Sequence, residues 1–249
     1  MPMECIPDSV LFSPTGPAVQ SSTLPPSSGP KNVVKLFCFD FDLTLAATHL
    51  YFELAQKYQP TDAASWIASY KSEYGLRPLE VFGGPSRVAL LRSCLSSIKS
   101  LGAVSVVVTK GVPACVREAL VTAGLGDLFQ GVTDFNPKQL AVLALMNGRE
   151  ERLRYDQAVL IDDDQRNFKG EYTRGGLLEG GWTEEMVRLY GTPAVECKEE
   201  RGWGKEGIGE SGYCRVFRVE KEKHGLDEGD MERIINMARD ENEGKQCHA

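Results

Sequence analysis

The stretch FCFDFDLTL, residues 37–45, places two acidic residues inside an apolar, aromatic-rich run. It continues the segment VVKLFCF, residues 33–39, which predicts a β-strand that is covered on both faces. Asp40 and Asp42 follow at the carboxyl end of this strand. A buried carboxylate without a counter-charge is costly, so these two acids need a compensating partner. The stretch therefore predicts a core strand with a functional site at its end.

Similar short apolar runs predict further strands at residues 104–108 (VSVVV), 157–161 (QAVLI) and 213–219 (YCRVFRV). Helical periodicity, with prolines near the starts and glycines at the ends, predicts helices over residues 86–102, 112–124, 136–148 and 227–241. Strands that alternate with helices predict an α/β fold with a Rossmann-like, doubly wound, mostly parallel sheet.

Two segments depart from this pattern. Residues 1–31 hold about half of the 13 prolines of the chain, mixed with Ser and Thr, and predict a disordered leader. Residues 169–211 are rich in Gly and charge and nearly lack apolar periodicity, which predicts an insertion or lid. We therefore expect one folded domain over residues 32–249.

Composition excludes several classes of function. A net charge of −7 and a pI near 5.2 give no reason to expect binding to nucleic acid or to an anionic membrane. The seven cysteines form no C-x-x-C pair, which favours a reducing compartment. The N-terminus has no secretory signal pattern, and no run of about 18 apolar residues occurs, so the cytoplasm is expected.

A second acidic cluster, Asp162 to Asp164, follows the strand predicted at residues 157–161. If the two strands are neighbours, their carboxylates meet at one edge of the sheet and repel each other unless a cation lies among them. Mg²⁺ is the natural candidate, since it takes oxygen ligands and commonly a phosphate oxygen. The alternative is that each cluster caps a helix or lies in a solvated turn.

Two further positions suggest a phosphate site. Thr109 ends the strand at residues 104–108 and precedes Lys110 and Gly111, so its hydroxyl and the next backbone N–H groups can hold an anion. Lys138 lies in the first turn of a predicted helix, where a cation opposes the helix dipole and needs a compensating partner. Taken singly, Thr109 is an ordinary strand end and Lys138 a solvated side chain.

These motifs, in this order, resemble those of the haloacid dehalogenase (HAD) superfamily. DFDLT (40–44) resembles its D-x-D-x-T motif, VVVT (106–109) its second motif, Lys138 its third and LIDDDQRNF (160–168) its acidic fourth. The resemblance covers about residues 33–168. It implies an enzyme with a HAD-like fold and Mg²⁺ as cofactor.

The resemblance also implies roles for individual residues. Asp40 would be the nucleophile that forms an aspartyl-phosphate, and Asp42 the acid and base that protonates the leaving oxygen and then activates water. Thr109 and Lys138 would hold the phosphoryl oxygens, with Lys110 beside them. Dehalogenases of this superfamily lack the second acid, so Asp42 favours a phosphatase that acts on a phosphomonoester, either a metabolite or a phosphoprotein.

The implied metal site lies between Asp40, the backbone carbonyl of Asp42 and Asp163, with Asp162 as an accessory residue. Asp164 stands where the family usually has a small residue. A shift of one residue in the alignment would make Asp162 or Asp164 the direct ligand instead.

In this superfamily, the segment after the first motif often forms a cap that selects substrates. Here residues 45–83 have room for a small helical cap, with helices around 48–58 and 61–75. His49, just beyond the first motif, either contacts the substrate or simply begins a helix.

Three other functions compete with a phosphatase. One is a phosphotransferase of the same fold, and another is a catalytically weak scaffold that only binds partners. A response-regulator receiver is rejected, because its lysine follows the last strand of the site, whereas Lys138 precedes the second acidic cluster.

Overall fold

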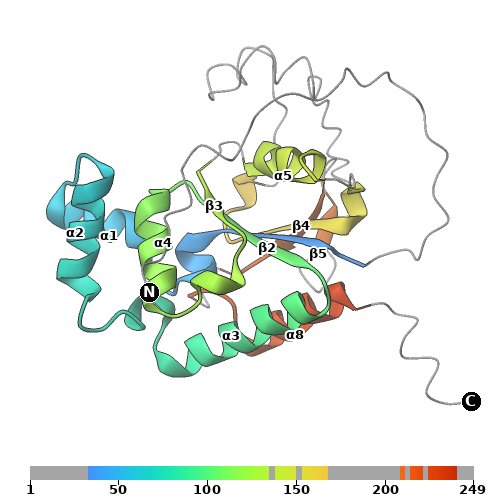
Figure 1. Ribbon diagram of the computed structural model, residues 1–249, viewed down its shortest axis with the longest axis horizontal. Coiled ribbons are helices and arrows are strands. Elements are labelled where there is room, and N and C mark those ends of the chain that lie inside the picture. Colours follow the sequence, from blue (N-terminus) through green and yellow to red (C-terminus); the bar gives the residue numbers. More distant parts are fainter. Residues whose placement is uncertain are drawn as a thin grey trace, which may run out of the picture.

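The computed structural model describes residues 33–134, 138–149, 153–167, 208–210, 214–220 and 224–239. Its centre is a six-stranded sheet with the order β3-β2-β1-β4-β6-β5 (Figure 1). The strands are β1 (Leu36–Phe39), β2 (Val104–Val108), β3 (Val132–Thr133), β4 (Ala158–Asp162), β5 (Ile208–Glu210) and β6 (Arg215–Arg218). Five strands are parallel and only the edge strand β5 runs antiparallel, which confirms the expected α/β, mostly parallel sheet.

Helices cover both faces of the sheet. Helices α3 (Pro85–Ser100), α4 (Pro113–Thr122) and α8 (Glu228–Ala238) share one core with Phe37 and Phe39 of β1. Helix α5 (Lys138–Asn147) packs on the opposite face, in a second core with Leu36 and Cys38. Figure 1 shows α3 and α8 together on one side of the sheet and α5 on the other. Successive residues of β1 thus enter different cores, which explains its unbroken apolar sequence.

The helices follow the local sequence signals. Pro85 and Pro113 lie in the first turns of α3 and α4, where a missing N–H costs nothing. Asp227 caps α8 by accepting a 2.8 Å hydrogen bond from the backbone N–H of Asp230. Asn136, expected to cap α5, lies outside the described residues.

Two short helices occupy the segment expected to form a cap: α1 (Leu50–Tyr58) and α2 (Ala63–Tyr74). Helix α2 is held against α4 by a 2.8 Å hydrogen bond between Tyr70 Oη and Thr122 Oγ1 and by a 3.0 Å ion pair between Lys71 and Glu118. Figure 1 places α1 and α2 beside α4, away from α5. Their selection of substrates remains a prediction.

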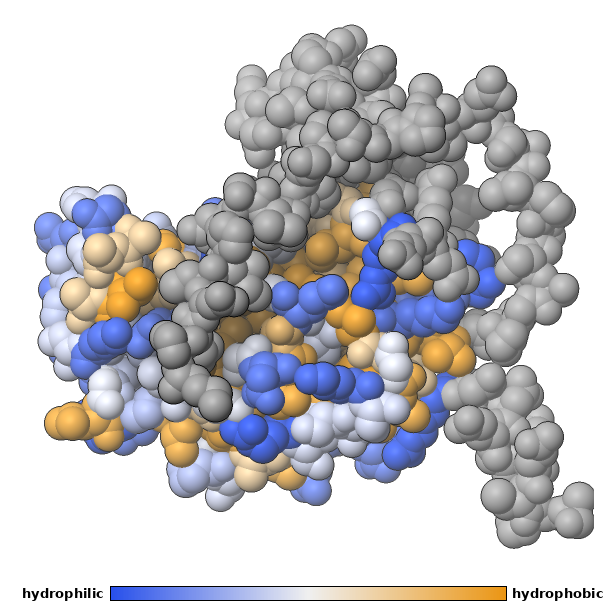
Figure 2. Space-filling view, in the orientation of Figure 1, coloured by the Kyte–Doolittle hydropathy of each residue, from blue (hydrophilic) through white to orange (hydrophobic). Residues whose placement is uncertain are grey.

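Strands β3 and β5 were not predicted from the sequence. Strand β5 lies inside the segment 169–211, most of which, like residues 1–31, falls outside the described residues. On the face shown in Figure 2, hydrophilic and hydrophobic side chains are interspersed over α1, α2 and α3. Within the described ranges, no helix has both the length and the apolar character of a membrane span.

Candidate active site

The residues proposed from the sequence lie at the carboxyl ends of β1, β2 and β4, where the strand order switches from one side of β1 to the other. From β1 the chain adds β2 and β3 on one side, whereas β4 and β6 lie on the other. In open α/β sheets, ligands bind at the carboxyl ends of the strands on either side of such a switch point. Asp40 follows β1 and donates its backbone N–H to Ile161 of β4 at 2.8 Å. Asp40 and the acids after β4 are therefore fixed as neighbours by the sheet itself.

Lys138 is the counter-charge that these acids require. Its Nζ lies 2.5 Å from Asp40 Oδ1 and 2.7 Å from Asp162 Oδ2, and its side chain is only 2% exposed. The lysine begins α5, where the helix dipole disfavours a cation, and the two carboxylates offset that cost. The first turn of α5 thus places a cation between the ends of β1 and β4.

Burial and the nearby charges shift the pKa values of both Lys138 and Asp40. Burial alone would lower the pKa of Lys138, but the charges of Asp40 and Asp162 raise it above its usual range. Burial raises the pKa of Asp40 well above its ordinary value; the charge of Asp162 adds to this rise and Lys138 opposes it. Asp40 therefore keeps its proton to a higher pH than a solvated aspartate does. A metal ion bound next to Asp40 favours the carboxylate.

A group of three carboxylates fits a metal ion. One oxygen from each of Asp40, Asp162 and Asp163 lies within 4.8 Å of the others, and all three residues are buried. Asp162 already has protein partners: Oδ2 accepts from Lys138 and from Asn167 Nδ2 at 2.9 Å, and Oδ1 accepts from the Asp164 backbone N–H at 2.8 Å. These bonds fix the orientation of the Asp162 carboxylate within the cluster.

Asp42 lies in a tight turn, η1 (Phe41–Leu45), that leads away from β1. The turn is closed by Leu43, whose φ of 56° lies in the left-handed region. The Asp42 carboxylate accepts hydrogen bonds from the backbone N–H groups of Leu50 and Tyr51, in the first turn of α1. Burial raises the pKa of Asp42, and His49 and these two N–H groups oppose the rise. Asp42 is thus an acid that keeps its proton to a higher pH than a solvated aspartate.

One oxygen of Asp42 is left for another partner. Within the described part of the chain, the buried Oδ1 accepts no hydrogen bond, which is costly for a carboxylate unless a ligand completes it. His49 Nδ1 lies 3.6 Å from the other oxygen, Oδ2. The sequence left the role of His49 open between contacting the substrate and beginning a helix; the structure places it just before α1 and beside Asp42.

Thr109 and Gly111 lie close together near Asp42. Thr109 is buried after β2, and its Oγ1 accepts from the Gly111 backbone N–H at 2.9 Å. A Cβ atom on Gly111 would lie 3.2 Å from Thr109 Oγ1 and 3.8 Å from Asp42 Oδ2. A side chain at position 111 would therefore crowd Thr109, and glycine permits this close approach. Lys110, the third residue expected at the phosphate site, carries its side chain at the exposed surface.

Arg87 is a residue of the site that sequence reasoning missed. Its guanidinium donates to the backbone carbonyls of Thr44 at 2.9 Å and Leu45 at 2.7 Å, which end the turn after Asp42. It also donates to Phe82 at 2.8 Å and Leu226 at 3.0 Å. Burial lowers the pKa of Arg87 to about 10, which still leaves it charged at neutral pH. Arg87 therefore fastens the turn to α3 and to the segment before α8.

Cys115, at the start of α4, is a potential nucleophile close to Asp42. Burial raises the pKa of Cys115 to about 12, and the charge of Asp42 adds to the rise. The side chain is therefore a neutral thiol at physiological pH, and thiols react as nucleophiles only when ionised. Asp40 is the stronger candidate for nucleophilic attack.

No protein-family model matches the chain, and no curated protein matches it. Among solved structures, it is similar to the HAD domain of the effector Lem4 from Legionella pneumophila, with 18% identity, a TM-score of 0.37, and coverage of 60% of this chain and 82% of that one.

Two other solved structures are also similar. L-2-haloacid dehalogenase from Xanthobacter autotrophicus shows 13% identity, a TM-score of 0.31, and coverage of 62% of this chain and 86% of that one. The Legionella pneumophila effector Ceg4 shows 16% identity, a TM-score of 0.44, and coverage of 84% and 97%. At these identities and scores, the functional argument rests on the geometry of the site.

Proposed function

We propose that this chain is a Mg²⁺-dependent phosphohydrolase of the HAD-like type that acts on a phosphomonoester through an aspartyl-phosphate. The observation that carries the proposal is the buried contact of Lys138 with both Asp40 and Asp162, with Asp163 beside them. A cluster of buried, mutually repelling acids around one lysine is costly for folding alone. It is useful when the acids bind a cation and attack an anionic substrate.

In the first step, a carboxylate oxygen of Asp40 attacks phosphorus and the bond from phosphorus to the leaving oxygen breaks. Asp42 gives its proton to the leaving oxygen, so the product departs as an alcohol. Thr109, the backbone around Lys110 and Gly111, and Lys138 hold the phosphoryl oxygens. The raised pKa of Asp42 favours this step, since the protonated acid is the form that donates.

In the second step, Asp42 takes a proton from water while the oxygen of that water attacks phosphorus. The bond between phosphorus and Asp40 breaks, which restores the carboxylate and releases inorganic phosphate. Asp42 is then protonated again and ready for the next substrate. Asp42 thus serves as an acid in the first step and as a base in the second, because the second step resembles the first in reverse, with water in place of the alcohol.

The donor set fits Mg²⁺, which prefers oxygen ligands and tolerates a site with few protein ligands. Asp40, Asp163 and the backbone carbonyl of Asp42 would hold the ion, and Asp162 would orient them through Lys138 and Asn167. When bound, Mg²⁺ supplies positive charge that neutralises the phosphoryl oxygens and the carboxylates. The unsatisfied Oδ1 of Asp42 is a feature that a bound phosphomonoester would complete.

A related phosphotransferase is the second candidate, because the same aspartyl-phosphate can pass its phosphoryl group to an alcohol. The partly exposed positions of Tyr51 and His49 beside Asp42 leave room for an acceptor other than water. Added alcohols that yield new phosphomonoesters would favour this function. Release of inorganic phosphate alone favours the hydrolase.

The substrate is a phosphorylated metabolite or a phosphoprotein, and nucleic acid and membranes are not expected partners. A reducing compartment, and hence the cytoplasm, is proposed as the location. Four described cysteines, at positions 38, 94, 115 and 214, are buried thiols, in keeping with this proposal.

The direct test is hydrolysis of an aryl phosphate by the wild type and by Asp40→Asn, with Mg²⁺ and with a chelator. We expect turnover that requires both Mg²⁺ and Asp40, with circular dichroism showing that the variant is folded. Equal turnover by Asp40→Asn would contradict the proposal. Release of chloride from 2-chloropropionate with no phosphate hydrolysis would support a dehalogenase instead.

A further inference from the structure

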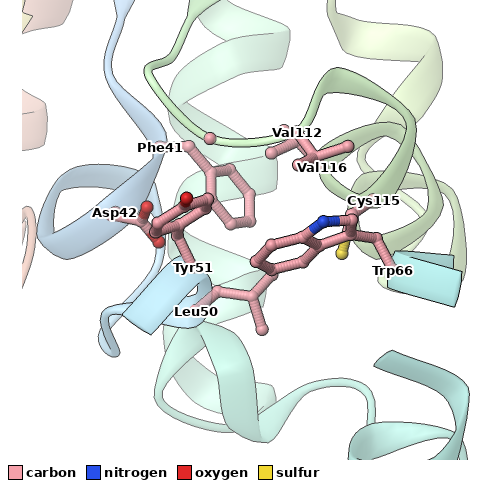
Figure 3. A pocket seen from close by; sticks show the side chains of 9 residues that line it. Phe41, Asp42, Leu50, Tyr51, Trp66, Val112, Cys115 and Val116 are labelled. Atoms are coloured by element: carbon pink, nitrogen blue, oxygen red, sulfur yellow. The ribbon is translucent and has the colours of Figure 1, made fainter. Parts of the chain in front are cut away.

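A pocket opens directly beside the Asp42 carboxylate (Figure 3). About 210 Å³ lies within its bounds when the space open to solvent is counted, but its enclosed part holds only about 10 Å³, so the pocket is a shallow depression. Helices α1 and α2 contribute Leu50, Tyr51 and Trp66 to it, and residues 111–116 contribute the opposite side. Figure 3 shows Asp42 at one end of the pocket and Trp66 at the other, with Tyr51 between them. The pocket thus extends from the proposed acid toward the helices of the expected cap.

The wall of this pocket is apolar. Among the described residues that line it, Asp42 is the only acidic or basic one, and Cys115 is a neutral thiol. A sugar or a charged group placed here would lose hydrogen bonds to water without replacing them, which is costly. An apolar group would gain by removing both surfaces from water. The pocket therefore selects against polar leaving groups.

Aromatic rings give the pocket a preferred shape. The rings of Tyr51 and Trp66 are stacked, with centroids 4.9 Å apart and planes inclined by 16°. Tyr51 is 39% exposed, so part of its side chain remains available to a ligand. The pocket is shallow and open on one side, which suits a flat group lying against its wall better than a bulky one.

The residues behind the stack are fixed. Trp66 is 8% exposed, and its helix α2 is tied to α4 by the bonds from Tyr70 to Thr122 and from Lys71 to Glu118. Tyr51 follows Leu50 at the start of α1, whose first N–H groups bind Asp42. The aromatic surface is therefore held in a constant position relative to the acid, as recognition of a substrate requires.

We propose that the leaving group of the substrate lies against the apolar wall of this pocket and that this group is aromatic, with Tyr51 and the Trp66 ring stacked on it as the specificity-determining residues. The inference rests on the proposed function, in which Asp42 protonates the leaving oxygen. Because Asp42 lines the pocket, the carbon attached to that oxygen lies on the pocket side. The preferred substrates are then phosphomonoesters with an aromatic leaving group.

The test compares benzyl phosphate with cyclohexylmethyl phosphate, whose leaving alcohols are similar in basicity but differ in aromaticity. We expect kcat/KM to favour benzyl phosphate, and Trp66→Leu and Tyr51→Leu each to reduce that preference by roughly three- to tenfold, the range for loss of an aromatic contact. Leu76→Ala is the control, since Leu76 is a fully exposed apolar residue outside the pocket. It should leave the preference unchanged.

Acetyl phosphate tests the phosphohydrolase function apart from the aromatic pocket, because its small leaving group does not need the aromatic wall. Its Mg²⁺-dependent hydrolysis by the wild type tests the proposed function without the aromatic wall. Hydrolysis of acetyl phosphate without any preference for benzyl phosphate would overturn the aromatic pocket and leave the proposed function standing. No hydrolysis of any of these compounds would overturn both.

The aromatic group can belong to a small molecule or to a protein. Phenyl phosphate and a phosphotyrosine peptide carry the same leaving ring, so comparing their kcat/KM values distinguishes the two sources. A phosphoserine peptide of the same sequence is the control for peptide contacts. Faster hydrolysis of the phosphoserine peptide than of the phosphotyrosine peptide would contradict the inference.

Discussion

Replacing Lys138 with methionine tests the electrostatic account of the site. Methionine keeps much of the apolar length of the side chain but removes the charge that lies between Asp40 and Asp162. Breaking a buried ion pair by removing one partner costs about 3–5 kcal/mol, because the remaining charge is left buried without compensation. At about 2–4 °C per kcal/mol for a chain of this size, the melting temperature should fall by roughly 6–20 °C.

The loss should depend on pH. The pKa of Asp40 is already raised by burial and by Asp162, and removing Lys138 removes a charge that opposes the rise. A carboxyl group whose pKa is higher in the folded state destabilises the fold once the pH exceeds its unfolded value of about 4. The pKa of Lys138 is raised, so its contribution in the wild type stays constant well below pH 10. The difference in melting temperature should therefore widen from pH 4 toward neutrality.

Thermal unfolding followed by circular dichroism, in a chelating buffer, measures this difference. Lys57→Met is the matched control, because Lys57 is also ion-paired, to Glu73, but is 58% exposed. It should melt as the wild type does, since exposed pairs contribute little. Adding Asp162→Asn to Lys138→Met should recover part of the lost stability, because one uncompensated charge is removed. A Lys138→Met protein that melts with the wild type at every pH would refute the reasoning.

Four further predictions follow from the same geometry. Mg²⁺ at a hundredfold excess over its Kd should stabilise the wild type by about 2.7 kcal/mol in calorimetry, and Asp163→Asn should abolish this gain. Gly111→Ala should weaken inhibition by inorganic phosphate, because its Cβ would crowd the Thr109 hydroxyl at 3.2 Å; unchanged inhibition would contradict the phosphate site. Arg87→Met should lower stability in urea titrations by about 3 kcal/mol and reduce kcat, since four carbonyls lose a charged donor; wild-type kcat would show that the turn needs no such support. For benzyl phosphate, kcat should fall as pH rises through the raised pKa of Asp42, because the protonated form donates, and a flat profile would exclude this role.

The sequence predicted the central strands and the main helices because their signals are local. Strands β1, β2 and β4 are short apolar runs, and the prolines of α3 and α4 mark their first turns. Strand β3 has only two residues, Val132 and Thr133, too few to form a pattern. Strand β5 lies in a Gly-rich segment and exists through its pairing with β6, a contact that periodicity does not report.

Some residues of the site were predicted from the sequence and others were not. Asp40, Lys138 and Asp163 were proposed from motif order, and parallel pairing of β1 with β4 brings their elements together. The role of Arg87 was not predicted, because in the sequence it is one polar residue of an amphipathic helix. The backbone carbonyls that it binds lie far away in the chain. The pocket also depends on how α2 packs against α4. No local pattern records such contacts between distant segments.

The central claim is that Asp40 carries the phosphoryl group during turnover. A rapid acid quench of the reaction with an aryl phosphate and Mg²⁺, followed by borohydride reduction, converts an aspartyl-phosphate to homoserine, which mass spectrometry locates within the peptide. We predict homoserine at position 40 in the wild type, and none in Asp40→Asn or in the wild type without substrate. Turnover with an unmodified Asp40, or with the label on another residue, would contradict the account.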